Sequence, residues 1–220
     1  MGDRPYFISV EEARKICEQS PPVLSTERVH IDDCHGRILA EDLASKVHDP
    51  PFDNSSMDGF ACRFDENATY PLTLSIVGIQ AATGQNETVT VGDGKAARIM
   101  TGAPMPPGAD AILPIERCRV DGNQVHLQEA PKPHFVRRLG ENLQKGTVAM
   151  TKGTQLTPSR VGLCATMGYA DVLVYRQLRI ALISTGDELI QPGEELVHGE
   201  IYESNSFGLA GLVKWMGHIP

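Results

Sequence analysis

Residues Ile99–Glu116 read IMTGAPMPPGADAILPIE. Apolar and β-branched residues at both ends predict two short strands, and the prolines and glycines between them predict a rigid connecting loop. Preset proline φ angles reduce the entropy lost when a loop is ordered around a ligand. The Thr101 hydroxyl and the neighbouring amides are therefore candidates for binding an oxyanion or a phosphate. The same pattern also fits a stiff connector that binds nothing.

Short strands of the same kind surround this stretch. The segments LTLSIVG, AARIM, AILPIE and QVHL alternate with residues rich in Gly, Pro, Asn and Asp between Pro50 and Lys132. Strands this short and this evenly punctuated indicate a small β-rich lobe, such as a barrel.

Regular elements of a second kind flank the lobe. Ser9 and Glu12 have the spacing of a capping box, so we expect a helix from about Val10 to Gln19 whose apolar stripe docks on another element. A strand is predicted at Glu27–Ile31. Thr157-Pro158 is typical of a helix start, and a further strand is predicted at Asp171–Tyr175.

The stretch LRIALISTGDEL, Leu178–Leu189, predicts a strand over Leu178–Ser184 that ends in a polar cluster. A helix from about Ser206 to Met216 follows, as at the opening of an α/β unit. Ligands bind beyond the carboxyl ends of strands in such units, so Thr185, Gly186, Asp187 and Glu188 are candidate site residues. Adjacent carboxylates beside a glycine suit Mg²⁺ and a phosphate, although a capped turn with solvated acids fits equally well.

Two other loops carry candidate residues. The loop PPFDNSSMDGFA, Pro50–Ala61, can hold the Asp58 carboxylate in a fixed position, but it also fits an Asx-turn loop whose aspartates only cap backbone amides. In RRLGENLQKG, Arg137–Gly146, the paired arginines suit recognition of phosphate or carboxylate, or simply form a solvated basic face.

Composition and charge exclude several classes of protein. The net charge of -8 argues against a generic nucleic-acid binder, which needs basic surface to displace counterions. The 5 cysteines and 7 histidines are scattered, without the spacing of a zinc site or a disulfide framework. No apolar run has the length of a signal peptide or a membrane span. We therefore expect a cytoplasmic protein with neither nucleic acid nor membrane as its partner.

Three stretches resemble the molybdopterin molybdenumtransferase family, which includes the C-terminal domain of gephyrin. They are FDNSSMDGFA, RIMTGAPMPPGADAILPIE and ISTGDELIQPGEEL with the following GEIYESN, and the resemblance covers nearly the whole chain. It implies an enzyme of molybdenum cofactor biosynthesis that inserts molybdate into adenylylated molybdopterin and releases AMP, with Mg²⁺ required. It also implies a homodimer, with molybdopterin adenylyltransferase as the upstream partner.

The resemblance also implies roles for individual residues. Catalytic roles fall on Asp58, Thr101 and Glu188, and metal binding falls on Asp58, Asp187 and Glu188. Binding of the pterin substrate falls on Thr185, Gly186, Asp187, Ser204 and Asn205. These roles are physically coherent because the pterin is polyanionic and molybdate is a dianion, so the reaction needs charge neutralisation and positioning more than a strong base.

The expected fold is a multi-domain α+β chain with a mixed β-rich lobe inserted in an elongated domain. Residues 1–48 would form the N-terminal helix and the first part of the elongated domain, 49–136 the inserted lobe, and 137–177 the return to the elongated domain. Residues 178–220 would be the truncated start of an α/β domain of the molybdopterin-binding type.

Two departures from the family pattern stand out. Asn142 occupies a position where many relatives carry aspartate, which puts a ligand role there in doubt. The chain also lacks a glycine-rich segment and a C-terminal β domain, so we expect it to be inactive alone. The main alternative is a dimeric scaffold or binding module of the gephyrin type without turnover. A general nucleotide-binding α/β protein is disfavoured because GxxxxGK[ST] and GxGxxG are absent from the sequence.

Overall fold

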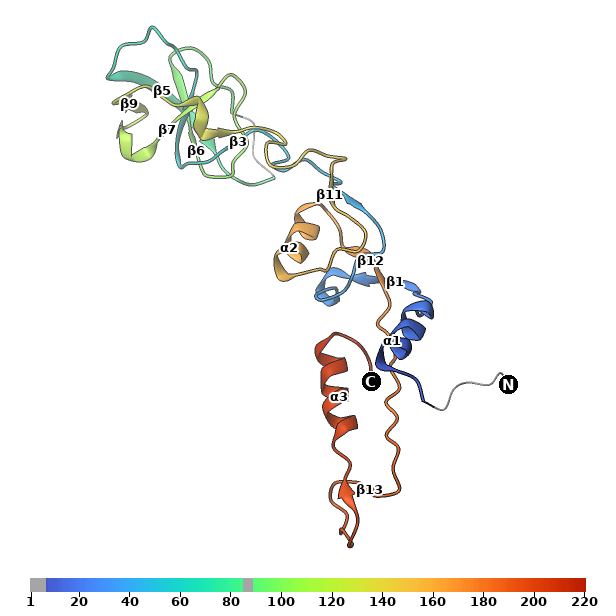
Figure 1. Ribbon diagram of the computed structural model, residues 1–220. Helices are drawn as coiled ribbons and strands as arrows, with labels where there is room; N and C mark the ends of the chain where they lie inside the picture. Colours follow the sequence, from blue (N-terminus) through green and yellow to red (C-terminus); the bar gives the residue numbers. More distant parts are fainter. Residues whose placement is uncertain (1–6, 85–88) are drawn as a thin grey trace. The chain divides into compact units, whose positions relative to one another are not determined.

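The computed structural model describes residues 7–84 and 89–220, and the chain divides into two compact units (Figure 1). The first, called here the flanking unit, comprises Met1–Asp42, Thr151–Gly162 and Ala170–Pro220. The second, called the β unit, comprises Leu43–Met150 and Leu163–Tyr169. The chain therefore passes from the flanking unit into the β unit and then returns to the flanking unit. The fold is of the mixed α+β class.

A six-stranded mixed sheet dominates the β unit. Its order is β7-β4-β6-β5-β9-β8, with β5 and β6 parallel and the other neighbours antiparallel. The predicted β-rich lobe is confirmed, but among the described residues no pairing joins β7 to β8, so the sheet is not a closed barrel. The six strands are β4 (Gly59–Cys62), β5 (Leu72–Gln80), β6 (Lys95–Ile99), β7 (Ala111–Pro114), β8 (Cys118–Asp121) and β9 (Gln124–Leu127).

The core of the β unit lies on both faces of β4. Successive side chains of a strand point to opposite faces, so Phe60 and Cys62 enter one apolar cluster while Ala61 enters another. All four residues of β4 are buried. Short pairs complete the unit: β3 (Asn54–Ser55) with β10 (Val136–Arg137), and β2 (Leu43–Ala44) with β11 (Val148–Met150).

The flanking unit contains the predicted helices. Helix α1 (Val10–Gln19) begins with the expected capping box between Ser9 and Glu12. No residue of α1 is buried, so the expected docking of its apolar stripe stays a prediction. The other elements are β1 (Thr26–His30), which pairs antiparallel with β12 (Asp171–Tyr175), and then β13 (Leu189–Ile190), β14 (Ile201–Tyr202) and α3 (Asn205–Trp215). Helix α2 (Pro158–Thr166) begins in the flanking unit, and its residues from Leu163 onward belong to the β unit. Among the described residues, single-turn 3₁₀ helices lie at Ile31–Asp33 in the flanking unit and at Ile115–Arg117 and Pro133–Phe135 in the β unit.

The strand predicted over Leu178–Ser184 is wrong. This segment forms no regular strand, and its backbone pairs with Ile219 through bonds at Leu178 and Ile180 of 2.9 and 2.8 Å. A strand requires a neighbour along its length, because otherwise its N–H and C=O groups have no ladder to join. The near-continuous apolar run that predicted the strand does not supply that neighbour, and Ile183 is 83% exposed.

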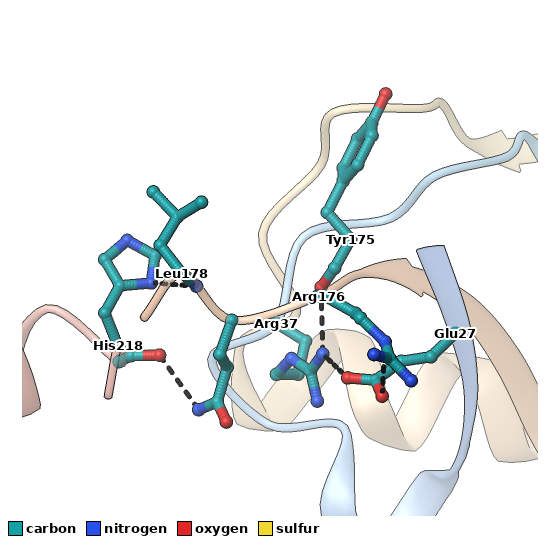
Figure 2. Close-up of polar contacts among 8 residues, drawn as sticks. Glu27, Arg37, Tyr175, Arg176, Leu178 and His218 are labelled. Carbon is teal, nitrogen blue, oxygen red and sulfur yellow. Dashed lines mark hydrogen bonds and ion pairs between the residues drawn. The ribbon is translucent and has the colours of Figure 1, made fainter. Parts of the chain in front are cut away.

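A polar network ties the start of this segment to the body of the flanking unit (Figure 2). Arg37 bridges the Glu27 carboxylate and the Tyr175 carbonyl, and Arg176 lies 3.4 Å from the same carboxylate. Beyond Tyr175, Gln177 donates to the Gly217 carbonyl at 2.9 Å. One carboxylate and two carbonyls thus hold the chain where it leaves β12.

Within the described residues, no helix is both long enough and apolar enough to cross a membrane.

Candidate functional site

The structure brings together two of the predicted loops in the β unit. The Asp58 carboxylate accepts hydrogen bonds from the backbone N–H and the hydroxyl of Thr101, each at 2.7 Å through Oδ1. Strand pairing causes this meeting: Asp58 directly precedes β4, Thr101 follows β6, and Gly59 lies opposite Ile99 in the antiparallel register. On the other side, the Ile115 N–H donates to the Asp58 carbonyl at 3.0 Å and fixes its backbone.

These hydrogen bonds favour the ionised form of the Asp58 carboxyl. The Thr101 backbone N–H, and then its hydroxyl, lower the pKa of the Asp58 carboxyl. Because the pKa of Asp58 is lower in the folded state, its hydrogen bonds to Thr101 stabilise the fold fully at pH values above the pKa of the unfolded chain, about 3.9. This stabilisation is lost as the pH falls through the lower pKa of the folded chain. At neutral pH the site therefore presents a fixed negative charge on an exposed loop.

Replacing Thr101 with valine should raise the pKa of Asp58, because the hydroxyl donor is lost while the backbone N–H remains. Titration of the Asp58 carboxyl carbon by NMR measures the shift. Thr101→Ser keeps the hydroxyl and should leave the pKa close to that of the unaltered chain. An unchanged pKa in Thr101→Val would show that the hydroxyl does not stabilise the carboxylate.

The Thr-Gly turn beside this pair is held by the Pro50–Ala61 loop. Gly102 donates to the Ser55 carbonyl at 2.8 Å, and Ser55 donates back to the Ala103 carbonyl at 3.0 Å. Gly102 has a φ of +82°, a conformation that favours glycine. Both loops are therefore rigid at the point where Asp58 and Thr101 meet.

The second group of predicted residues lies in the flanking unit. Thr185, Gly186, Asp187 and Glu188 form an exposed loop that leads into β13. The Glu188 carboxylate folds back over Gly186, because a Cβ at Gly186 would lie 2.5 Å from Glu188 Oε2. The Glu188 carboxylate therefore lies over a backbone position that has no side chain, and Asp187 is its neighbour in sequence.

Helix α3 begins close to its predicted position. Ser204 is its N-cap residue and Asn205 its first residue, and the Ser204 side chain makes no capping hydrogen bond. Glu203, which the sequence reasoning missed, caps the helix instead: it accepts from the Ser206 N–H at 2.7 Å and from the Ser206 hydroxyl. The preference of acidic residues for helix N-termini is the signal that would have identified it.

The described residues contain no cluster of three or more His, Cys, Asp or Glu side chains that could hold a metal ion. The predicted metal ligands come from different units: Asp58 from the β unit, Asp187 and Glu188 from the flanking unit. Mg²⁺ is often held by one or two carboxylates together with substrate phosphates, so the chemistry of the Asp187–Glu188 loop fits such an ion. The complete ligand set stays a prediction.

The remaining candidates have internal partners. Arg138 contacts the Asp53 carboxylate at 2.7 Å. The pKa of Asp53 is lowered, mainly by the hydrogen bond from the Leu139 N–H and then by the one from Arg138. Asn142 donates its side-chain amide to Asp49 at 3.2 Å. Position 142 therefore contributes a neutral donor to a neighbouring carboxylate where an aspartate would add a second negative charge.

The geometry defines a class of protein: a multi-domain α+β chain that presents a fixed carboxylate on one unit and an exposed acidic loop on the other. The MoeA N-terminal region (domain I and II) family matches residues 8–168. The chain belongs to this family.

Relatives of known name extend the match. The molybdopterin molybdenumtransferase of Haemophilus influenzae is 39% identical over 211 residues, covering 94% of this chain and 52% of the relative. The molybdopterin molybdenumtransferase of Bacillus subtilis is 37% identical over 209 residues, which cover 90% of this chain and 48% of the relative. The chain thus spans about half the length of the curated relatives it matches.

Solved structures agree with the fold. The molybdopterin biosynthesis moeA protein from Pyrococcus horikoshii OT3 has a TM-score of 0.80 and 32% sequence identity, over 89% of this chain and 53% of that one. The resemblance to the molybdopterin molybdenumtransferase family and the α+β fold class are confirmed. The relationship to gephyrin stays a prediction.

Proposed function

We propose that this chain forms part of a molybdopterin molybdenumtransferase, which inserts molybdate into adenylylated molybdopterin and releases AMP with Mg²⁺. The observation that carries the proposal is the pair of hydrogen bonds between Asp58 and Thr101, which joins two of the three stretches that resemble the family. The names of relatives that are 37–39% identical support the same chemistry.

Each loop has a role in this proposal. Asp58, held ionised by Thr101, supplies a fixed charge that orients a bound cation or a leaving phosphate. Asp187 and Glu188 would hold Mg²⁺, which when bound screens the repulsion between the pterin phosphates and molybdate. Thr185, Gly186, Ser204 and Asn205 would contact the pterin substrate around the same loop.

The test is molybdate-dependent AMP release by the full-length protein. Asp58→Asn and Glu188→Gln remove one charge each while keeping side-chain volume, and each should lower kcat by about 100-fold or more. Asp93→Asn is the matched control: it also removes a carboxylate charge from the β unit, but its side chain is 86% exposed and pairs with Arg63. Normal AMP release by both site variants would contradict the proposed roles.

A cytoplasmic homodimer supplied by molybdopterin adenylyltransferase belongs to the same proposal. The apolar side chains of α1 support an intermolecular contact, since Val10 and Ile16 are 80% and 55% exposed. A scaffold of the gephyrin type without turnover is the alternative. Dimerisation and partner binding without AMP release in the full-length protein would favour it.

A further inference from the structure

Glu203 is an unusual residue for its position. Glu203 is 4% exposed, and among the described residues it is the only buried Asp or Glu. A buried carboxylate is costly unless donors satisfy it, so its partners indicate what holds it there.

Three donors surround the Glu203 carboxylate. The Ser206 N–H donates to Oε1 at 2.7 Å, and the Ser206 hydroxyl donates to Oε2. The Ser184 hydroxyl donates to Oε1 at 2.9 Å. Glu203 therefore occupies the anion-binding position at the N-terminus of α3 with its own charge, and a ligand anion at that end of the helix would have to displace it.

The third donor links Glu203 to the candidate site. Ser184 directly precedes Thr185, the first residue of the Thr185–Glu188 loop. At the other end of the loop, the Ile201 N–H donates to the Glu188 carbonyl at 2.8 Å, and the Glu203 N–H donates to the Ile190 carbonyl at 2.8 Å. One short segment, Ile201–Glu203, thus contacts both ends of the four-residue loop.

From this geometry we infer that Glu203 is a positioning residue, which clamps the Thr185–Glu188 loop through Ser184 and couples it to the start of α3. The inference rests on the proposed function for what the loop binds. Both carboxylate oxygens accept hydrogen bonds from Ser184 or Ser206, so Glu203 acts through these two serines. Holding both loop ends reduces the conformational freedom that ligand binding would otherwise have to remove.

Donation from the Ser206 hydroxyl, and then from its N–H, lowers the pKa of Glu203. The clamp therefore stays charged at neutral pH. Because the pKa of Glu203 is lowered by folding, the clamp stabilises the fold fully at pH values above the pKa of the unfolded chain. This stabilisation is lost as the pH falls through the pKa of the folded chain.

Ser184→Ala tests the clamp most sharply, because it removes the link to the loop and leaves both bonds from Ser206 to Glu203 in place. In the 220-residue chain, backbone ¹⁵N relaxation should show the order parameters of Gly186 and Asp187 falling toward the flexible range, below about 0.6. Those of residues in α3 should stay unchanged. Ser184→Thr keeps the hydroxyl and should restore the ordered loop, while Glu203→Gln should loosen the loop and the start of α3 together.

In the full-length protein, Ser184→Ala should raise the KM for adenylylated molybdopterin about tenfold with a smaller effect on kcat, and Ser184→Thr should reverse the change. Unchanged order parameters in Ser184→Ala would overturn the inference, whatever the activity. If the unaltered full-length protein releases no AMP, the proposed function fails, while the relaxation measurement still decides whether Glu203 clamps the loop.

Discussion

Gly59→Ala is expected to destabilise the β unit by about 3 kcal/mol or more. A Cβ at position 59 would lie 2.1 Å from the Leu113 carbonyl oxygen and 2.9 Å from its carbonyl carbon. These are backbone atoms of the adjacent strand, so no side-chain rotation can relieve the overlap. Strand β4 can move away from β7 only by straining its pairing with β6 on its other edge.

The same clash should displace the site. Gly59 follows Asp58 directly, so a shift of β4 away from β7 would also disturb the hydrogen bonds from Thr101. Urea unfolding should give a lower midpoint for Gly59→Ala, and the NMR signal of the Thr101 amide should move.

Gly162→Ala is the matched control for this substitution. Gly162 lies within α2, and a Cβ there would meet no atom within 4 Å. Alanine is the better helix former by about 1 kcal/mol, so this variant should be as stable as the unaltered chain or more stable. Equal midpoints for the two variants would show that the β4–β7 spacing is softer than the structure indicates.

Arg37→Ala is expected to destabilise the flanking unit by about 2–3 kcal/mol. The Arg37 side chain is 13% exposed and bridges the Glu27 carboxylate and the Tyr175 carbonyl, the latter at 2.8 Å (Figure 2). Without the guanidinium, the Glu27 carboxylate keeps only Arg176, at 3.4 Å, and the Tyr175 carbonyl loses the donor that Arg37 supplied. The cost comes mainly from the Tyr175 carbonyl, which loses the guanidinium donor, and from the Glu27 carboxylate, which keeps only the longer contact with Arg176.

Chemical unfolding followed by circular dichroism measures this effect. Arg14→Ala is the control, because its pair with Glu18 on α1 is 79% and 60% exposed and should contribute less than about 0.5 kcal/mol. Arg37→Lys should recover only part of the loss, because an ammonium group does not reproduce the planar geometry with which the guanidinium binds both acceptors. A midpoint for Arg37→Ala equal to that of Arg14→Ala would contradict the structural role of the network.

Local sequence was sufficient where the deciding contacts are local. The capping box of α1 joins residues three positions apart, so Ser9 and Glu12 predicted the start of that helix correctly. The strands of the β unit followed from turn residues and apolar runs in the same way. Resemblance between whole stretches then identified the family, which no single motif could do.

Contacts between distant residues were decided only in the tertiary structure. Asp58 and Thr101 are 43 residues apart, and their hydrogen bonds depend on the register of β4 and β6, which neither loop encodes alone. The strand predicted at Leu178–Ser184 was wrong because a strand depends on its neighbour as well as on its own residues. Glu203 escaped notice because its role depends on Ser184, 19 positions earlier. The sequence by itself determined the local elements and the family, while chain pairing decided which side chains meet, because hydrogen bonds between distant segments exist only once the backbone has folded.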